Sequence, residues 1–90
     1  MSKLYKVIKT KTGRGGNQST YEQVGTLEEL IQAYSYTLEC GDSYSHEKGN
    51  KKINQHPKTI KGLVTNLYNA ANNSAADGYS GCNFNFEIVN

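Results

Sequence analysis

The stretch from Pro57 to Asn73 constrains the fold of this chain more than any other segment. Its apolar residues recur at the three- and four-residue spacing of an α-helix and share one face: Ile60, Leu63, Val64, Leu67, Tyr68 and Ala71. Pro57 suits the first turn of such a helix, where its missing N–H costs nothing. A helix with one apolar face must lie on another element, so the rest of the chain has to supply a sheet or a second helix.

A second helix is predicted from Thr26 to Gly41. Thr26 and Glu29 have the spacing of a capping box, in which each side chain bonds a backbone N–H of the other residue. One face of this helix carries an apolar stripe: Leu27, Leu30, Ile31, Tyr34 and Leu38. Gly41 is expected to end the helix, because glycine readily adopts the backbone conformation of a C-terminal cap.

Residues 3–11 and 18–24 are predicted to form a β-hairpin around the glycine-rich turn at 13–17. Leu4 and Ile8 are expected to face the core. The alternation breaks in the middle of the first strand, however, so the sequence does not fix its inward face.

Residues 82–89 alternate strictly and predict the last strand, with one apolar face formed by Cys82, Phe84, Phe86 and Ile88. The element order ββααβ predicts a single α+β domain over residues 1–90, in which an α-hairpin covers one face of a three-stranded sheet. The last strand is expected to run parallel to the first if the two pair, in the order 2-1-3; the order 1-2-3 stays open. The open sheet face and the edge strands favour pairing with a second copy, so we expect a homodimer.

Residues 42–56 are polar and show no periodicity, and they hold both histidines, Tyr44 and three lysines. A loop of this length in a small domain is usually functional or mobile, and the sequence does not say whether it is ordered. Residues 72–81 are predicted to be a soft connector.

Charge is distributed unevenly along the 90 residues, although the formal net charge is only +2. Residues 3–14 hold five of the ten cations and residues 48–61 hold the other five. Residues 15–47 hold six carboxylates and no cation. The chain is therefore two basic clusters around an acidic segment.

No apolar run approaches the roughly 18 residues of a membrane span, and the N-terminus lacks the apolar segment of a signal peptide. We therefore expect a cytoplasmic protein without a membrane partner. Cys40 and Cys82 are then expected to be reduced thiols with a structural role.

The sequence carries no catalytic signature. Cys40, His46, His56 and Cys82 are the only soft metal ligands, and their spacing matches no zinc pattern. The glycines at 13–16 lack the spacing of a phosphate loop. We expect a protein that is not an enzyme, with no catalytic residue, metal or cofactor.

Nucleic acid is one candidate ligand, because lysines bind phosphates by releasing counterions and need no base sequence to do so. The candidate contacts come from both basic clusters: Lys6, Lys9, Lys11, Arg14, Lys48, Lys51, Lys52 and Lys61. Tyr5, Tyr21 and Tyr44 lie near these clusters and can stack on unpaired bases. A net charge of +2 is nevertheless low for a dedicated nucleic-acid binder, so a merely solvated basic surface is the competing interpretation.

A protein partner is the second candidate, because a dipolar chain can match a dipolar surface. The residues that would contact it lie on the acidic helix face and at the start of the loop: Glu28, Glu29, Tyr36, Glu39 and Tyr44.

Two stretches, TLEELIQAYSYTLECG at 26–41 and PKTIKGLVTNLYNAANN at 57–73, resemble the small accessory proteins of T4-like phages. That resemblance implies a host-takeover or anti-defence protein that binds a host target, such as an RNA-targeting toxin or a CRISPR nuclease. The expected function is a non-enzymatic inhibitor of a host defence factor with RNA contact, for example an inhibitor of a toxin–antitoxin ribonuclease. The alternative is a pure protein–protein inhibitor of the anti-CRISPR kind that uses the acidic helix face.

Overall fold

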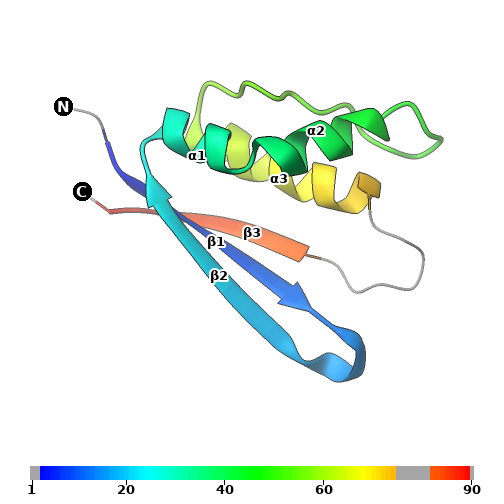
Figure 1. Ribbon diagram of the computed structural model, residues 1–90, viewed down its shortest axis with the longest axis horizontal. Helices are drawn as coiled ribbons and strands as arrows, with labels where there is room; N and C mark the ends of the chain where they lie inside the picture. Colours follow the sequence, from blue (N-terminus) through cyan, green and yellow to red (C-terminus); the bar gives the residue numbers. More distant parts are fainter. Residues whose placement is uncertain (1–2, 75–81, 90) are drawn as a thin grey trace.

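The structure, a computed structural model, describes residues 3–74 and 82–89. The elements in chain order are β1 (Tyr5–Thr12), a 3₁₀ turn (Arg14–Gly16), β2 (Gln18–Gly25), α1 (Leu27–Ala33), α2 (Ser35–Ser43), α3 (Ile60–Ser74) and β3 (Cys82–Ile88). The three strands form one sheet in the order β2-β1-β3, and the helices cover one of its faces (Figure 1). The predicted α+β class and the three-stranded sheet are confirmed.

The direction of β3 differs from the expectation. β3 lies beside β1, as in the predicted order 2-1-3, but it runs antiparallel to β1, with Lys11 opposite Cys82 and Tyr5 opposite Ile88. The cause is the course of α3, which ends above the same end of the sheet at which β3 begins (Figure 1). The expectation of a parallel last strand was therefore wrong.

The inward face of β1 is the one that carries Val7. Residues opposite each other in an antiparallel pair share a face, and Val7 lies between Gln23 of β2 and Phe86 of β3. Val7 is fully buried, whereas Ile8 lies on the open face opposite Asn85. The expectation that Ile8 faces the core was wrong, because the strict alternation of β3 sets the face for its neighbour.

The core lies between the sheet and α3, with contributions from α1 and α2. Its fully buried members are Val7, Leu30, Leu38, Leu63, Leu67 and Ala70. The Tyr34 ring meets Phe84 edge-on, with ring centroids 6.2 Å apart. The buried stripe of α3 is rotated from the predicted one, because Ala70 and Asn73 are buried while Tyr68 is 45 % exposed.

The predicted capping box is present at the start of α1. The Glu29 carboxylate accepts a hydrogen bond from the Thr26 N–H at 2.8 Å, and the Thr26 hydroxyl accepts one from the Glu29 N–H at 3.2 Å. The predicted single helix is divided at Tyr34, and it continues through Gly41 to Ser43. Gly41 is needed for another reason: a Cβ there would overlap Ala70 of α3.

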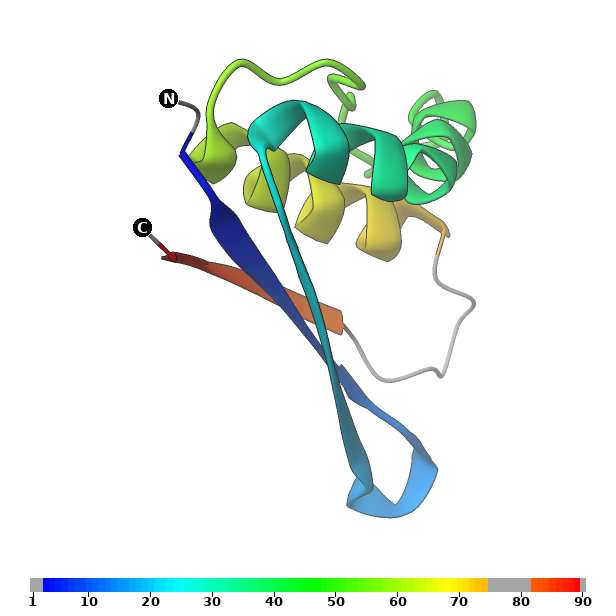
Figure 2. The same cartoon turned by 60° about the vertical axis from the view of Figure 1, so that its left-hand side comes forward.

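The segment 44–59 runs back along α3 and is joined to it by hydrogen bonds. Asn73 accepts a hydrogen bond from the Lys51 N–H at 3.0 Å and donates to the Lys51 carbonyl at 2.6 Å. Further along, Asn66 accepts from the Asn54 N–H at 2.8 Å. Because of this return, α2 and α3 point in the same direction (Figures 1 and 2). A long crossover segment joins the two helices, whereas the helices of an α-hairpin are antiparallel and are joined by a short turn.

Candidate nucleic-acid interface

The hairpin of β1 and β2 extends beyond the helices. Its outer part, residues 9–21, is called the distal hairpin below, and both views show it projecting away from the helical layer (Figures 1 and 2). The side chains of β2 are exposed from Gln18 to Val24. These exposed side chains are therefore accessible to a ligand.

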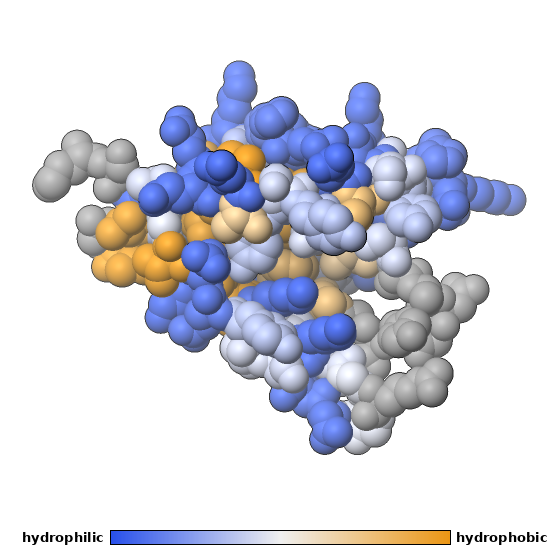
Figure 3. All heavy atoms as spheres, in the orientation of Figure 1, coloured by the Kyte–Doolittle hydropathy of each residue, from blue (hydrophilic) through white to orange (hydrophobic). Residues whose placement is uncertain are grey.

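The distal hairpin has only positive formal charge. It carries Lys9, Lys11 and Arg14 and no carboxylate. Lys9 and Lys11 share the sheet face on which Val7 is buried, but they lie further along β1, towards the turn that contains Arg14. The surface of the hairpin is polar, as Figure 3 shows.

Tyr21 lies at the base of the distal hairpin. It is opposite Lys9 in the β1–β2 register, and its side chain is 54 % exposed. The Lys9 Nζ lies 5.8 Å from the centre of the Tyr21 ring, a cation–π contact that orients both groups. Cations beside an exposed aromatic ring are the combination that single-stranded nucleic acids require, namely charge for phosphates and a flat surface for bases.

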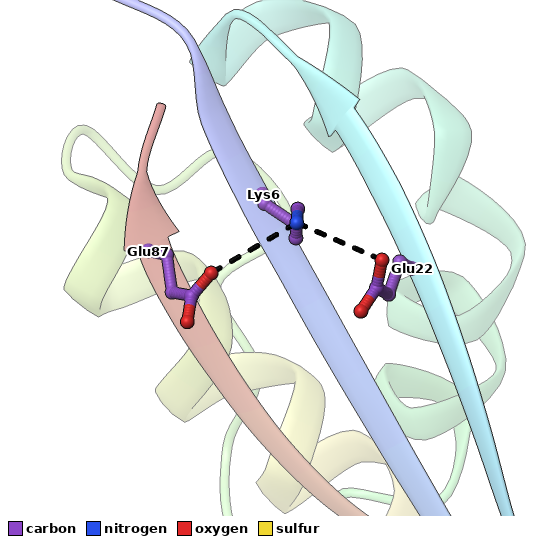
Figure 4. A network of polar contacts seen from close by, with 3 residues as sticks. All are labelled: Lys6, Glu22 and Glu87. Atoms are coloured by element: carbon purple, nitrogen blue, oxygen red, sulfur yellow. Dashed lines mark ion pairs between the residues drawn. The ribbon is translucent and has the colours of Figure 1, made fainter. Parts of the chain in front are cut away.

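Lys6 does not belong to this set. It lies on the open sheet face, where its Nζ is 3.7 Å from the Glu22 carboxylate and 4.0 Å from the Glu87 carboxylate (Figure 4). The two carboxylates neutralise Lys6 and leave this part of the open face with a net negative formal charge. Lys6 is therefore poorly suited to a phosphate contact.

The second basic cluster is remote from the first. Lys48, Lys51 and Lys52 are exposed on the 44–59 segment, which passes on the far side of the helices from the distal hairpin, and Lys61 is exposed on α3 (Figure 1). The structure thus does not bring the two clusters together. Two asparagines near this cluster, Asn66 and Asn73, bind the backbone of the 44–59 segment.

The candidate protein contacts lie on α1, on α2 and at Tyr44, the residue that follows α2. Glu29 is occupied by the capping box, whereas Glu28 and Glu39 are exposed. Tyr36 is the most exposed of the large hydrophobic residues on the described surface, at 77 %. Its pKa is raised, first by a hydrogen bond with the Cys40 side chain and then by nearby negative charge, which includes Glu39.

Within 3–74 and 82–89, no three His, Cys, Asp or Glu side chains lie close enough to share a metal ion. An open hollow of about 510 Å³ beside His56 includes Asp42, but the Asp42 carboxylate accepts a hydrogen bond from Gln55 at 2.8 Å. Cys40 and Cys82 are free thiols. No helix in the described part of the chain is long and apolar enough to cross a membrane.

Comparison of the chain with protein-family models, with curated proteins and with solved structures finds no match. The site therefore has to be judged from its own residues. The sequence alone did not reveal that Glu22 and Glu87 neutralise Lys6, nor that Lys9 lies over Tyr21. Both facts depend on strand register, since the partners are 12 to 81 positions apart in the chain.

Proposed function

We propose that this protein is a non-enzymatic binding domain that contacts RNA through the distal hairpin. The main support is the charge of that hairpin: three cations and no carboxylate between Lys9 and Tyr21, on an element that extends beyond the core. Phosphate contacts of this kind give affinity without sequence reading. The exposed ring of Tyr21 adds a preference for unpaired bases, because base pairs in a duplex hide their faces.

In keeping with the resemblance to accessory proteins of T4-like phages, we propose that the domain acts in the host cytoplasm and inhibits or modulates a defence factor that works on RNA. A toxin–antitoxin ribonuclease is an example of such a target. RNA and a host protein would then be joint partners, and the working form would be a homodimer.

The test is fluorescence anisotropy with a labelled, unstructured RNA of roughly ten nucleotides over a series of salt concentrations. The variant Lys9→Gln/Lys11→Gln removes two cations from the distal hairpin. The variant Lys51→Gln/Lys52→Gln removes the same charge from the 44–59 segment and is the matched control.

We expect the hairpin variant to bind more weakly and to lower the slope of log affinity against log salt by about 1.4, or roughly 0.7 for each lost phosphate contact. The control variant should keep the wild-type slope. Equal losses in both variants would mean that RNA responds to net charge alone. Binding by neither wild type nor variants would refute the proposal.

The alternative is a pure protein–protein inhibitor that uses the surface around Tyr36. Its support is the 77 % exposure of the Tyr36 side chain between acidic residues, because exposed tyrosines are common anchors in interfaces. Tyr36→Ala would then abolish inhibition, with little response to salt, and the hairpin lysines would be dispensable.

A further inference from the structure

The edge strand β2 carries little of the usual protection against pairing, because its one charged side chain, Glu22, is paired with Lys6 of β1. It is eight residues long, it contains neither lysine nor proline, and its side chains from Gln18 to Val24 are exposed on both faces. Helix α1 packs near the C-terminal end of β2, where Glu29 lies against Gly25. A long, regular and uncovered edge is a template for another strand.

The direction of the backbone groups of β2 follows from its register with β1. The Gly13 N–H donates to the Asn17 carbonyl at 2.7 Å, which identifies that pair as hydrogen-bonded. Hydrogen-bonded and non-bonded pairs alternate along an antiparallel ladder, so Ser19, Tyr21 and Gln23 bond to β1. The N–H and C=O groups of the alternate residues point away from the sheet: Gln18, Thr20, Glu22 and Val24.

We propose that a second copy of this chain pairs with that edge, β2 antiparallel to β2, with Tyr21 opposite the Tyr21 of the second copy. The two three-stranded sheets then become one six-stranded sheet with both helical layers on the same side. This pairing refines the homodimer proposed above by naming its interface, and it does not depend on RNA binding.

Two factors favour one register of this pairing: repulsion between like charges and the number of β2 residues that are paired. A two-fold axis at Glu22 would place two like charges directly opposite each other, which destabilises a strand pair. An axis at Thr20 would leave the end of β2 unpaired. The axis at Tyr21 pairs Gln18 with Val24 and Thr20 with Glu22, and it places the two tyrosine rings side by side, a favourable cross-strand pair.

The same register also matches charges at the two ends. It places Gly25 opposite Asn17 of the second copy, so the turn that carries Arg14 lies beside the first turn of α1, which carries Glu28 and Glu29. Each copy offers both the basic turn and the acidic helix start, so the match occurs twice. Lys9 and Tyr21 of both copies then form one row across the sheet, so these two proposed RNA contacts become continuous between the copies.

The pairing is tested by disulfide trapping in the full chain, with Cys40→Ser and Cys82→Ser as background. Tyr21→Cys should form a disulfide-linked dimer on mild oxidation, because non-hydrogen-bonded opposite residues lie close enough for a disulfide. Gln23→Cys is the matched control on the same face; the register places it opposite Ser19, so it should not link to itself. The pair Ser19→Cys and Gln23→Cys, mixed as separate proteins, should link.

Sedimentation of the wild-type chain gives the second readout, with a dimer expected and with RNA absent. Thr20→Pro removes an N–H that points away from the sheet, so it should yield a folded monomer. A folded wild-type monomer at every concentration, or a dimer in which Gln23→Cys links to itself as well as Tyr21→Cys does, would overturn the pairing. If Thr20→Pro fails to fold, the cysteine results alone decide. RNA binding by a monomer would leave the proposed function standing without this interface.

Discussion

The substitution Asn73→Ala should lower the free energy of unfolding more than the replacement of a solvent-exposed polar residue would. Asn73 is 8 % exposed and makes two hydrogen bonds to the backbone of Lys51 and one to the Gly41 carbonyl. The Gly41 carbonyl keeps another partner, the Tyr44 N–H, so the loss falls mainly on the N–H and C=O of Lys51. At about 1 kcal/mol for each lost bond, with partial burial of the orphaned groups added, the cost is about 2–3 kcal/mol.

The assay is urea unfolding followed by circular dichroism, with the neighbouring Asn72→Ala as control. Asn72 is exposed and, among the described residues, its side chain bonds only the Tyr68 carbonyl of its own helix, so its removal should cost less than about 0.5 kcal/mol. For a chain of this size the Asn73 loss corresponds to a fall in Tm of roughly 10–20 °C. Equal effects of the two substitutions would refute the role assigned to Asn73 in holding the 44–59 segment.

Three further outcomes follow from the packing and the charges. Gly41→Ala should cost about 1–3 kcal/mol in the same unfolding assay, because the added Cβ overlaps Ala70; a loss below about 0.5 kcal/mol would contradict the close approach of α2 and α3. Burial raises the pKa of Tyr34, so the stability that it contributes is present below pH 10 and is lost as the pH rises through the raised pKa; unfolding measured against alkaline pH should show a smaller decline in Tyr34→Phe, and identical curves would contradict this. Lys6→Met should change stability by less than about 1 kcal/mol and leave RNA affinity unchanged, since its ion pairs are exposed; a weakening of RNA binding equal to that of Lys11→Gln would return Lys6 to the binding set.

Features that depend on neighbouring residues were predictable from the sequence. The capping box of Thr26 and Glu29 joins residues three positions apart, and it forms as expected. The glycine-rich turn at 13–17 and the strand from Cys82 to Ile88 were likewise predictable, because each is defined by a few consecutive residues. These signals sufficed to predict the fold class and the number of strands.

Features that depend on distant residues were not predictable. The choice between Val7 and Ile8 as the inward residue is made by β3, which is about 80 positions away in the chain. The sequence suggests that Gly41 ends a helix. The structure shows instead that Gly41 gives room for Ala70 of α3, which passes beside it. From the sequence, Asn73 would be assigned to the solvent-exposed face of a helix. Its actual partner is the backbone of Lys51, which lies in a segment without any periodic pattern, so the contact could not be predicted.

The candidate site shows the same division. Its cations and Tyr21 were identifiable by residue type, but their grouping was not. Lys6 and Lys9 are close in sequence, yet they lie on opposite faces of β1, and only Lys6 is neutralised by carboxylates. The separation of the two basic clusters depends on the return path of the 44–59 segment, which no local signal predicts.

The most direct test of the proposed RNA contact is an amide NMR titration of the nitrogen-labelled protein with the unstructured RNA. We predict that the resonances of the distal hairpin, residues 9–21, shift as RNA is added and that those of Lys51, Lys52 and α2 do not. Shifts confined to α1 and α2, or to the 44–59 segment, would contradict the assignment of the site. A spectrum that RNA leaves unchanged would contradict RNA binding itself.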